Sequence, residues 1–194
     1  MNETTVVLKD NSANPAPLGL FAFGMTTVLL NLHNAGLYDL DSMILAMGIF
    51  YGGLAQVIAG IMEARKKNTF GFTAFLSYGF FWLTLVTLLV LPKLGWAAAI
   101  TGKSLGCYLL LWGIFTFLLF LGTLRISRAL QVVFATLTIL FLLLAFSEFS
   151  GNKNLGMIAG GEGILCGATA IYTATATLLN DVYGKTVLPL GIKS

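Results

Sequence analysis

The stretch ALQVVFATLTILFLLLAF, residues 129–146, contains no charged side chain. Five other apolar stretches accompany it, at residues 18–32, 42–62, 70–91, 104–124 and 155–179. Most approach the ~20 residues with which a helix crosses ~30 Å of hydrocarbon, and the short first one is expected to recruit Asn31, His33 and Asn34. Because 57% of the 194 residues are hydrophobic and only 10% are charged, a soluble fold could not bury this apolar surface. The sequence therefore predicts an all-α membrane protein with six transmembrane helices.

The basic residues between these stretches predict the orientation, because cytoplasmic loops of membrane proteins favour Lys and Arg. With both termini in the cytoplasm, eight basic residues fall inside and three outside: Lys9, Arg65, Lys66, Lys67, Arg125, Arg128, Lys185 and Lys193, against Lys93, Lys103 and Lys153. We therefore expect both termini in the cytoplasm. We divide the chain into a mobile cytoplasmic tail at 1–13, a six-helix domain at 14–183 and a second cytoplasmic tail at 184–194.

Several classes of function find little support. The basic residues form no cluster of the kind that binds nucleic acid. Cys107 and Cys166 lie inside apolar stretches, and neither a CxxC motif nor a Cys/His spacing for a metal occurs, so we expect no metal or cofactor. No nucleophile–base pair or phosphate-binding loop is present. The sequence therefore does not indicate an enzyme.

Small residues recur at four-residue spacing in two of the apolar stretches. They are Gly48, Gly52, Gly53 and Gly60 in the second stretch, and Gly156, Gly160, Gly163 and Gly167 in the sixth. Such residues let helix backbones approach closely in a membrane. Two alternatives stay open: each series packs helices within one subunit, or one of them forms a contact between subunits.

Two ionisable residues are candidates for a proton-linked role. Glu162 lies about two turns into the last stretch, and carboxylates in membranes usually face the protein interior or water. The alternative is that the neighbouring glycines leave it solvated. His33 is the only histidine, the residue type most often used as a pH-sensitive group, but a histidine between asparagines also suits a hydrogen-bonded helix end.

The motif NPAPLGL at residues 14–20 predicts a rigid helix start. Pro15 and Pro17 suit a first helical turn, and Asn14 can accept hydrogen bonds from free amides there. The unpaired amides of a helix start also attract anions, so the same motif suits an anion site.

A faint repeat relates NPAPLGLFAFG at 14–24 to NTFGFTAFLSYG at 68–79. Allowing one gap, Phe23 aligns with Tyr78, and the same depth in the fifth stretch falls near Leu137. The repeat predicts that these three residues share one level in the membrane.

The motif NPAPLGL, followed by GMTTVLLNLHNAG, AMGIFYGGLAQ, NTFGFTAFLSYGFFWLTLV and the closing LPLG, resembles the acetate uptake transporter family, of the bacterial succinate–acetate permease type. The resemblance covers nearly the whole chain, from Asn14 to about Gly191. It implies a homo-hexamer in the plasma (inner) membrane that takes up acetate, with succinate as a second substrate, in a proton-coupled or channel-like manner. It also implies an apolar constriction of Phe23, Tyr78 and Leu137, and a size-selecting small residue at Ala170. Glu162 departs from the family pattern.

With no Lys or Arg inside the stretches, the carboxylate is expected to meet weak partial charges. The expected substrate contacts are Asn14, Pro15, Leu18, Gly19, Phe23, Thr26, Thr27, Asn31, Tyr78, Thr84, Leu137 and Ala170. Passage as neutral acid avoids a desolvation cost, which makes proton-linked uptake natural. The partners would be acetate, succinate, protons and lipid. The alternatives are a channel for a small neutral solute such as urea or ammonia, and a sensor or scaffold that transports nothing.

Overall fold

The computed structural model describes residues 12–192, so most of the predicted tail at 1–13 and the last two residues of the tail at 184–194 lie outside the described part. The helices are α1 (Ala16–Asn34), α2 (Ser42–Ala46), the π-helical segment η1 (Met47–Ala55), α3 (Gln56–Arg65), α4 (Thr69–Val90), α5 (Gly102–Thr123), α6 (Arg128–Ser150) and α7 (Lys153–Tyr183). The segments α2, η1 and α3 join into one helix, Ser42–Arg65. The described residues thus contain six helices long and apolar enough to span a membrane, as predicted, and no strand.

The helix ends follow from local side-chain chemistry. Asn68, Thr101, Ser127 and Asn152 each stand before a helix, and each accepts a hydrogen bond from an amide of the first turn. Such a cap satisfies one of the donors that a helix start leaves free. Gly151 follows α6 with a φ of 64°, a backbone angle that glycine adopts without strain. The polar residues between the apolar stretches therefore set where each helix begins and ends.

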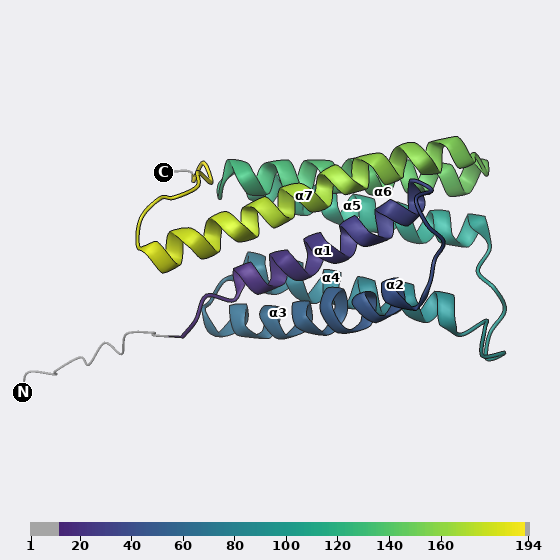
Figure 1. The fold of residues 1–194 in the computed structure, drawn as a ribbon, viewed down its shortest axis with the longest axis horizontal. Coiled ribbons are helices and arrows are strands. Elements are labelled where there is room, and N and C mark those ends of the chain that lie inside the picture. Colours follow the sequence, from purple (N-terminus) through teal and green to yellow (C-terminus); the bar gives the residue numbers. More distant parts are fainter. Residues whose placement is uncertain (1–11, 193–194) are drawn as a thin grey trace, which may run out of the picture.

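The helices form one elongated bundle in which α1 lies between α7 and the joined helix of α2, η1 and α3, with α5 and α6 on another side (Figure 1). The starts of α1, α4 and α6 and the ends of α3, α5 and α7 share one end of the bundle, which we call the tail end. The opposite end, where α1 gives way to α2 and α6 to α7, is called the far end. Six spans bring both ends of the described part, Ser12 and Ile192, to the tail end.

Both glycine series pack helices inside this one chain. A Cβ at Gly167 would lie 2.7 Å from the Gly24 carbonyl oxygen, and one at Gly160 would overlap the backbone of Ala35, so α7 lies directly against α1. A Cβ at Gly52 would lie 2.8 Å from the Trp82 ring, which places the second series against α4. The structure therefore accounts for both series by packing within one subunit.

Candidate functional site

Phe23 of α1, Tyr78 of α4 and Leu137 of α6, here called the central triad, come together near the middle of their helices. Their exposed fractions are 6%, 3% and 2%, and they belong to one buried apolar cluster. The ring centroids of Phe23 and Tyr78 lie 5.8 Å apart, with the planes tilted by 48°. Ala170 of α7 is fully buried in the same cluster. The three residues that the repeat placed at one level belong to one cluster and line one cavity, while their effect on a solute stays a prediction.

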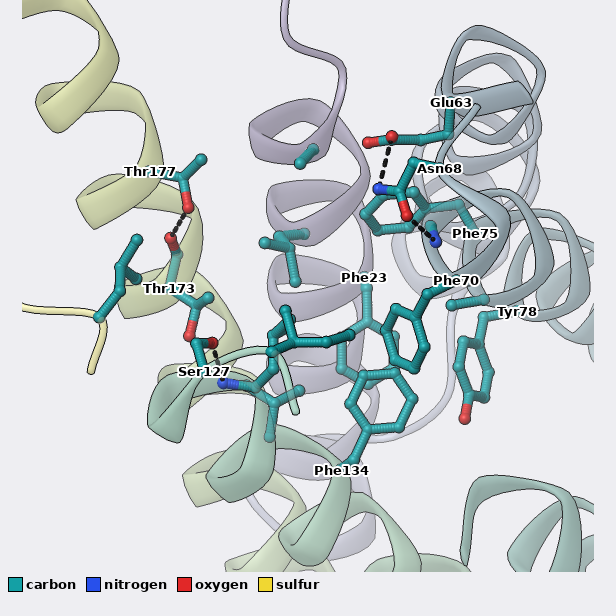
Figure 2. Close-up of a pocket in the computed structure, with 18 of the residues that line it drawn as sticks. Phe23, Glu63, Asn68, Phe70, Phe75, Tyr78, Ser127, Phe134, Thr173 and Thr177 are labelled. Carbon is teal, nitrogen blue, oxygen red and sulfur yellow. Dashed lines mark hydrogen bonds between the residues drawn. The ribbon is translucent and has the colours of Figure 1, made fainter. Parts of the chain in front are cut away.

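A cavity of about 250 Å³ extends from the central triad toward the tail end. Its wall is mostly apolar, and five parts of the bundle contribute to it as well as the segment after α7. Figure 2 shows Phe23, Phe70, Phe134 and Tyr78 close together on one part of the wall, and Thr173 and Thr177 on the opposite side. The lining residues from α1 and α3 are Ala16, Leu20, Phe23, Gln56 and Glu63; those from α4 and the segment before it are Asn68, Phe70, Gly71, Ala74, Phe75 and Tyr78; the others are Ile126, Ser127, Leu130, Val133, Phe134, Leu137, Thr173, Thr177, Leu190 and Ile192.

Most polar side chains in this wall already have partners in the protein. The Tyr78 hydroxyl points away from the cavity and donates to Thr116 Oγ1 at 2.9 Å. Thr173 and Thr177 each donate to a backbone carbonyl one turn earlier in α7. Ser127 Oγ accepts a hydrogen bond from the Leu130 amide. These groups stabilise the helices and leave few donors for a ligand.

Glu63 and Gln56 are the exceptions. Glu63 is 2% exposed; its Oε2 accepts a hydrogen bond from Asn68 Nδ2 at 2.8 Å, while its Oε1 has no partner among the described residues. Gln56 is 1% exposed, and its Oε1 is also without a partner there. The apolar stretch predicted at 42–62 ends one residue before Glu63, so the sequence predicts that Glu63 lies in the following loop, whereas the structure places it in the last turns of α3. Its only signal in the sequence is its spacing: Glu63 comes one turn after Ala59 and Gly60, so it lies on the same face of the helix as these small residues.

The segment after α7 folds back and closes one side of the cavity. The amides of Arg128 and Ala129 donate to the carbonyls of Gly191 and Leu190 at 2.9 and 3.0 Å. Asn180 holds the same segment through bonds to Val187 and Leu188. Leu190 and Ile192 therefore reach the cavity wall. The closing LPLG motif thus has a structural role at the tail end.

The start of α1 uses most of its own amides. Asn14 Oδ1 accepts a hydrogen bond from the Ala16 amide at 3.1 Å, and the Gly19 amide donates to the Pro15 carbonyl at 3.2 Å. Pro15 and Pro17 have no amide hydrogen. Gly19 is buried against α4, since a Cβ there would lie 2.5 Å from the Phe75 ring, while Leu18 is 37% exposed. This arrangement is a tight helix start beside the cavity, with few donors left for an anion.

The predicted hydroxyl contacts are divided. Thr26 and Thr27 lie one turn beyond Phe23, are 0% and 2% exposed, and their Oγ1 atoms have no partner among the described residues. Thr84 is exposed instead, and its hydroxyl is engaged with the Phe81 carbonyl and the Tyr108 hydroxyl. Thr26 and Thr27 are therefore buried one turn from Phe23 but outside the cavity wall, whereas Thr84 is exposed and engaged elsewhere.

At the far end, polar side chains hydrogen-bond to one another and to backbone carbonyls. Asn31 is 2% exposed, donates to the Thr27 carbonyl at 2.9 Å and accepts a hydrogen bond from Asn34 at 3.0 Å. It packs directly on Gly163, where a Cβ would overlap its side chain. His33 Nδ1 lies 2.8 Å from the Tyr38 carbonyl oxygen, an arrangement typical of a helix end.

Glu162 precedes Gly163, which packs on Asn31, so it lies level with these far-end residues, and it does not line the cavity. Both of its carboxyl oxygens are buried and have no partner among the described residues. Outside the spans, burial and then the charge of Asp41 raise the pKa of Tyr38, which keeps its hydroxyl protonated as it donates to the Leu29 carbonyl at 2.6 Å.

Comparisons with known proteins place this arrangement in a family. Residues 2–189 match the GPR1/FUN34/yaaH family. A relative from Escherichia coli K12, named succinate-acetate/proton symporter SatP, is 59% identical over 92% of this chain and 95% of its own length. A yeast relative from Saccharomyces cerevisiae, named ammonia transport outward protein 2, is 38% identical over 84% of this chain and 61% of its own length.

A solved structure agrees with the fold. The structure titled as that of the bacterial acetate channel SatP superimposes with a TM-score of 0.92 at 58% identity, covering 93% of this chain and all of the other. These relatives are named as transporters or channels, and the resemblance seen in the sequence motifs is confirmed. With six membrane-spanning helices and a family match over nearly its whole length, the chain is a multi-pass membrane protein that belongs to the GPR1/FUN34/yaaH family.

Proposed function

We propose that this protein carries acetate, with succinate as a second substrate, across the plasma (inner) membrane in a proton-linked or channel-like manner. The observation that carries the proposal is the central triad at the head of an apolar cavity of about 250 Å³. A relative with 59% identity is named a succinate-acetate/proton symporter, and a closely matching structure is titled an acetate channel. The names of these relatives also argue against a catalytic role.

The substrate path in this proposal follows α1. It passes from the cavity beside Ala16 and Leu20 to the central triad, then to the free hydroxyls of Thr26 and Thr27 and on to Asn31. Asn14, Pro15, Leu18 and Gly19 act by fixing the start of α1 beside the cavity, and Ala170 limits the space behind Leu137. Thr84 has no contact that supports a place on this path.

The chemistry of the cavity favours transport of the neutral acid. No Lys or Arg belongs to its described wall, so an anion would find no opposite charge there. Moving an unpaired charge into an apolar site is far more costly than moving a neutral group. A carboxylate that gains a proton before it passes the central triad avoids this cost, which supports proton-linked uptake.

Flux measurements in proteoliposomes test the proposal against the alternative solutes. Labelled acetate, urea and ammonium should be compared in vesicles with and without the protein, and unlabelled acetate should saturate the protein-dependent acetate flux. We expect such a flux for acetate and succinate only. Urea or ammonia flux without acetate flux would support the neutral-solute channel, and the absence of every flux would support a sensor or scaffold.

Orientation and assembly are part of the same proposal. We propose cytoplasmic termini, which would make the tail end and its cavity face the cytoplasm, and a homo-hexamer. Cysteines placed at Lys66 and Arg128 should react with a reagent from the cytoplasm, and cysteines at Asp41 and Lys153 from outside. The reverse pattern would reject the orientation. Native mass measurement in detergent tests the six-subunit state.

A further inference from the structure

We propose that Glu63 makes binding of the substrate carboxylate in the tail-end cavity depend on the uptake of one proton. This inference rests on the proposed function, since it names the group that links acetate to protons. The relevant geometry is a buried carboxyl group whose one free oxygen belongs to a residue of the cavity wall. Figure 2 shows Glu63 and Asn68 on the same cavity as Phe23 and Tyr78.

The protein holds the Glu63 carboxyl in place but leaves half of it free. Asn68 Nδ2 donates to Oε2 at 2.8 Å, while Asn68 Oδ1 accepts from the Gly71 amide at 3.1 Å, so the same Asn caps α4 and orients the carboxyl. A Cβ at Gly71 would lie 2.9 Å from Glu63 Cδ, so glycine leaves the room that the carboxyl occupies. The Oε1 atom remains without a partner among the described residues.

Few other charges act on this carboxyl group. Lys66, about one turn along the chain, is the charged residue whose field reaches it, and the Lys66 ammonium also donates to the Ser12 carbonyl at 3.0 Å. The wall contributed by α1, α6 and α7 holds apolar residues and threonines, and the segment after α7 adds Leu190 and Ile192. Tyr78 is the other titratable side chain of the wall, and its hydroxyl is turned to Thr116. Glu63 is therefore the one carboxyl group of the described cavity wall.

In a cavity of about 250 Å³, a bound substrate carboxylate lies close to the Glu63 carboxylate. At ~6 Å and an effective dielectric constant of about 20, two negative charges disfavour binding by roughly a hundredfold. A protonated Glu63 reverses this effect, because its O–H can donate to the substrate carboxylate in a strong charge-assisted hydrogen bond. The Gln56 carboxamide, which also has an unused oxygen, lies in the same wall and is able to donate a second hydrogen bond.

The proton balance follows directly. Neutral acetic acid that has passed the central triad gives its proton to the Glu63 carboxylate and becomes acetate. The acetate leaves to water, and the protonated Glu63 releases its proton to water and returns to its charged form. One proton thus moves with each acetate, and the reverse sequence describes export. Glu162 takes no part, since it lies outside the cavity wall.

Proton uptake on acetate binding tests this mechanism. The purified protein is mixed with acetate at pH 8 in weak buffer, an indicator dye reports protons taken up, and equilibrium dialysis with labelled acetate reports the amount bound. We expect about one proton per acetate for the wild type and for Glu162→Gln, the matched control. For Glu63→Gln we expect no proton uptake, and an acetate affinity that stays constant from pH 6 to pH 8 while the wild-type affinity falls about tenfold per pH unit.

The outcomes separate this inference from the function on which it rests. If Glu63→Gln still takes up one proton per acetate, the bound substrate itself keeps the proton inside the cavity, and the inference is wrong. If the wild type binds acetate without proton uptake, the inference is wrong even when Glu63→Gln does not fold. Glu63→Asp, which keeps a carboxyl group, should restore the uptake. Absence of protein-dependent acetate flux in vesicles would reject the proposed function itself.

Discussion

The two ends of the bundle both bury polar side chains, but they use them differently. At the far end, Asn31 bonds to Thr27 and Asn34 and packs on Gly163, so its amide is occupied and the helices touch. At the tail end, Glu63 and Gln56 are buried to a similar extent, yet each keeps an oxygen without a partner beside a cavity. Equal burial therefore does not mean equal roles: the Asn31 amide is satisfied within the protein, whereas Glu63 and Gln56 keep unused oxygens in residues that line the cavity.

The largest effect is expected from a change that separates α7 from α1, whose contact continues to the far end. In Gly167→Leu the new side chain would meet the backbone of Gly24, where nothing can move aside. Overpacking usually costs about 1–3 kcal/mol, and we expect at least the upper end here, with loss of most folded protein. Gly161→Leu is the matched control, since a Cβ there meets nothing within 4 Å. Size-exclusion profiles and thermal unfolding in detergent provide the measurement; equal behaviour of both variants would contradict the α1–α7 contact.

The second change opens the central triad. Leu137→Ala should cost about 2–5 kcal/mol of stability, as expected for a buried leucine that is 2% exposed. It should also admit larger acids, so that uptake of lactate rises severalfold relative to acetate. Ile139→Ala, on the same helix but 49% exposed, should change neither the ratio of lactate to acetate uptake nor the stability by much. Unchanged lactate uptake with normal acetate uptake would remove Leu137 from the path.

The third change separates the role of the Tyr78 hydroxyl from that of its ring in stability and in acetate uptake. Tyr78→Phe removes the hydroxyl that donates to Thr116 but keeps the ring beside Phe23. We expect a loss of about 1 kcal/mol in stability and little change in acetate uptake per folded molecule, because the hydroxyl points away from the cavity. Chemical denaturation and initial uptake rates measure the two effects. A marked rise in the KM for acetate would mean that the hydroxyl turns toward the substrate.

The smallest expected effect concerns the start of α1. Asn14→Ala removes the bond to the Ala16 amide and should cost about 1 kcal/mol, the usual value for a helix cap. Since the side chain is exposed and outside the cavity wall, acetate affinity per folded molecule should be retained. Initial uptake against acetate concentration, normalised to folded protein, decides the matter. A weakened affinity in a well-folded variant would make residues 14–19 part of the substrate site.

Much of the arrangement around the central triad was accessible from the sequence. The repeat and the family resemblance pointed to Phe23, Tyr78 and Leu137, and the structure brings them into one cluster. Local motifs carried this information because each residue sits at the same depth in its own helix. The glycine series, in contrast, allowed two alternatives, packing within one subunit or a contact between subunits. The sequence does not show which helix faces the glycines, and the structure does so through the contacts of Gly160 and Gly167 with α1.

The sequence by itself determined six spans and their approximate ends, because apolar length and capping residues are local properties of the chain. Only the tertiary structure showed that Glu63 is buried in a cavity wall while Thr84 is exposed. The physical reason is that hydropathy averages over a helix and does not say which face turns inward. The π-helical turns of η1 add to this, since they change the rotation of the helix before it reaches Glu63. Which polar atoms stay free beside a cavity thus depends on how all the helices pack together.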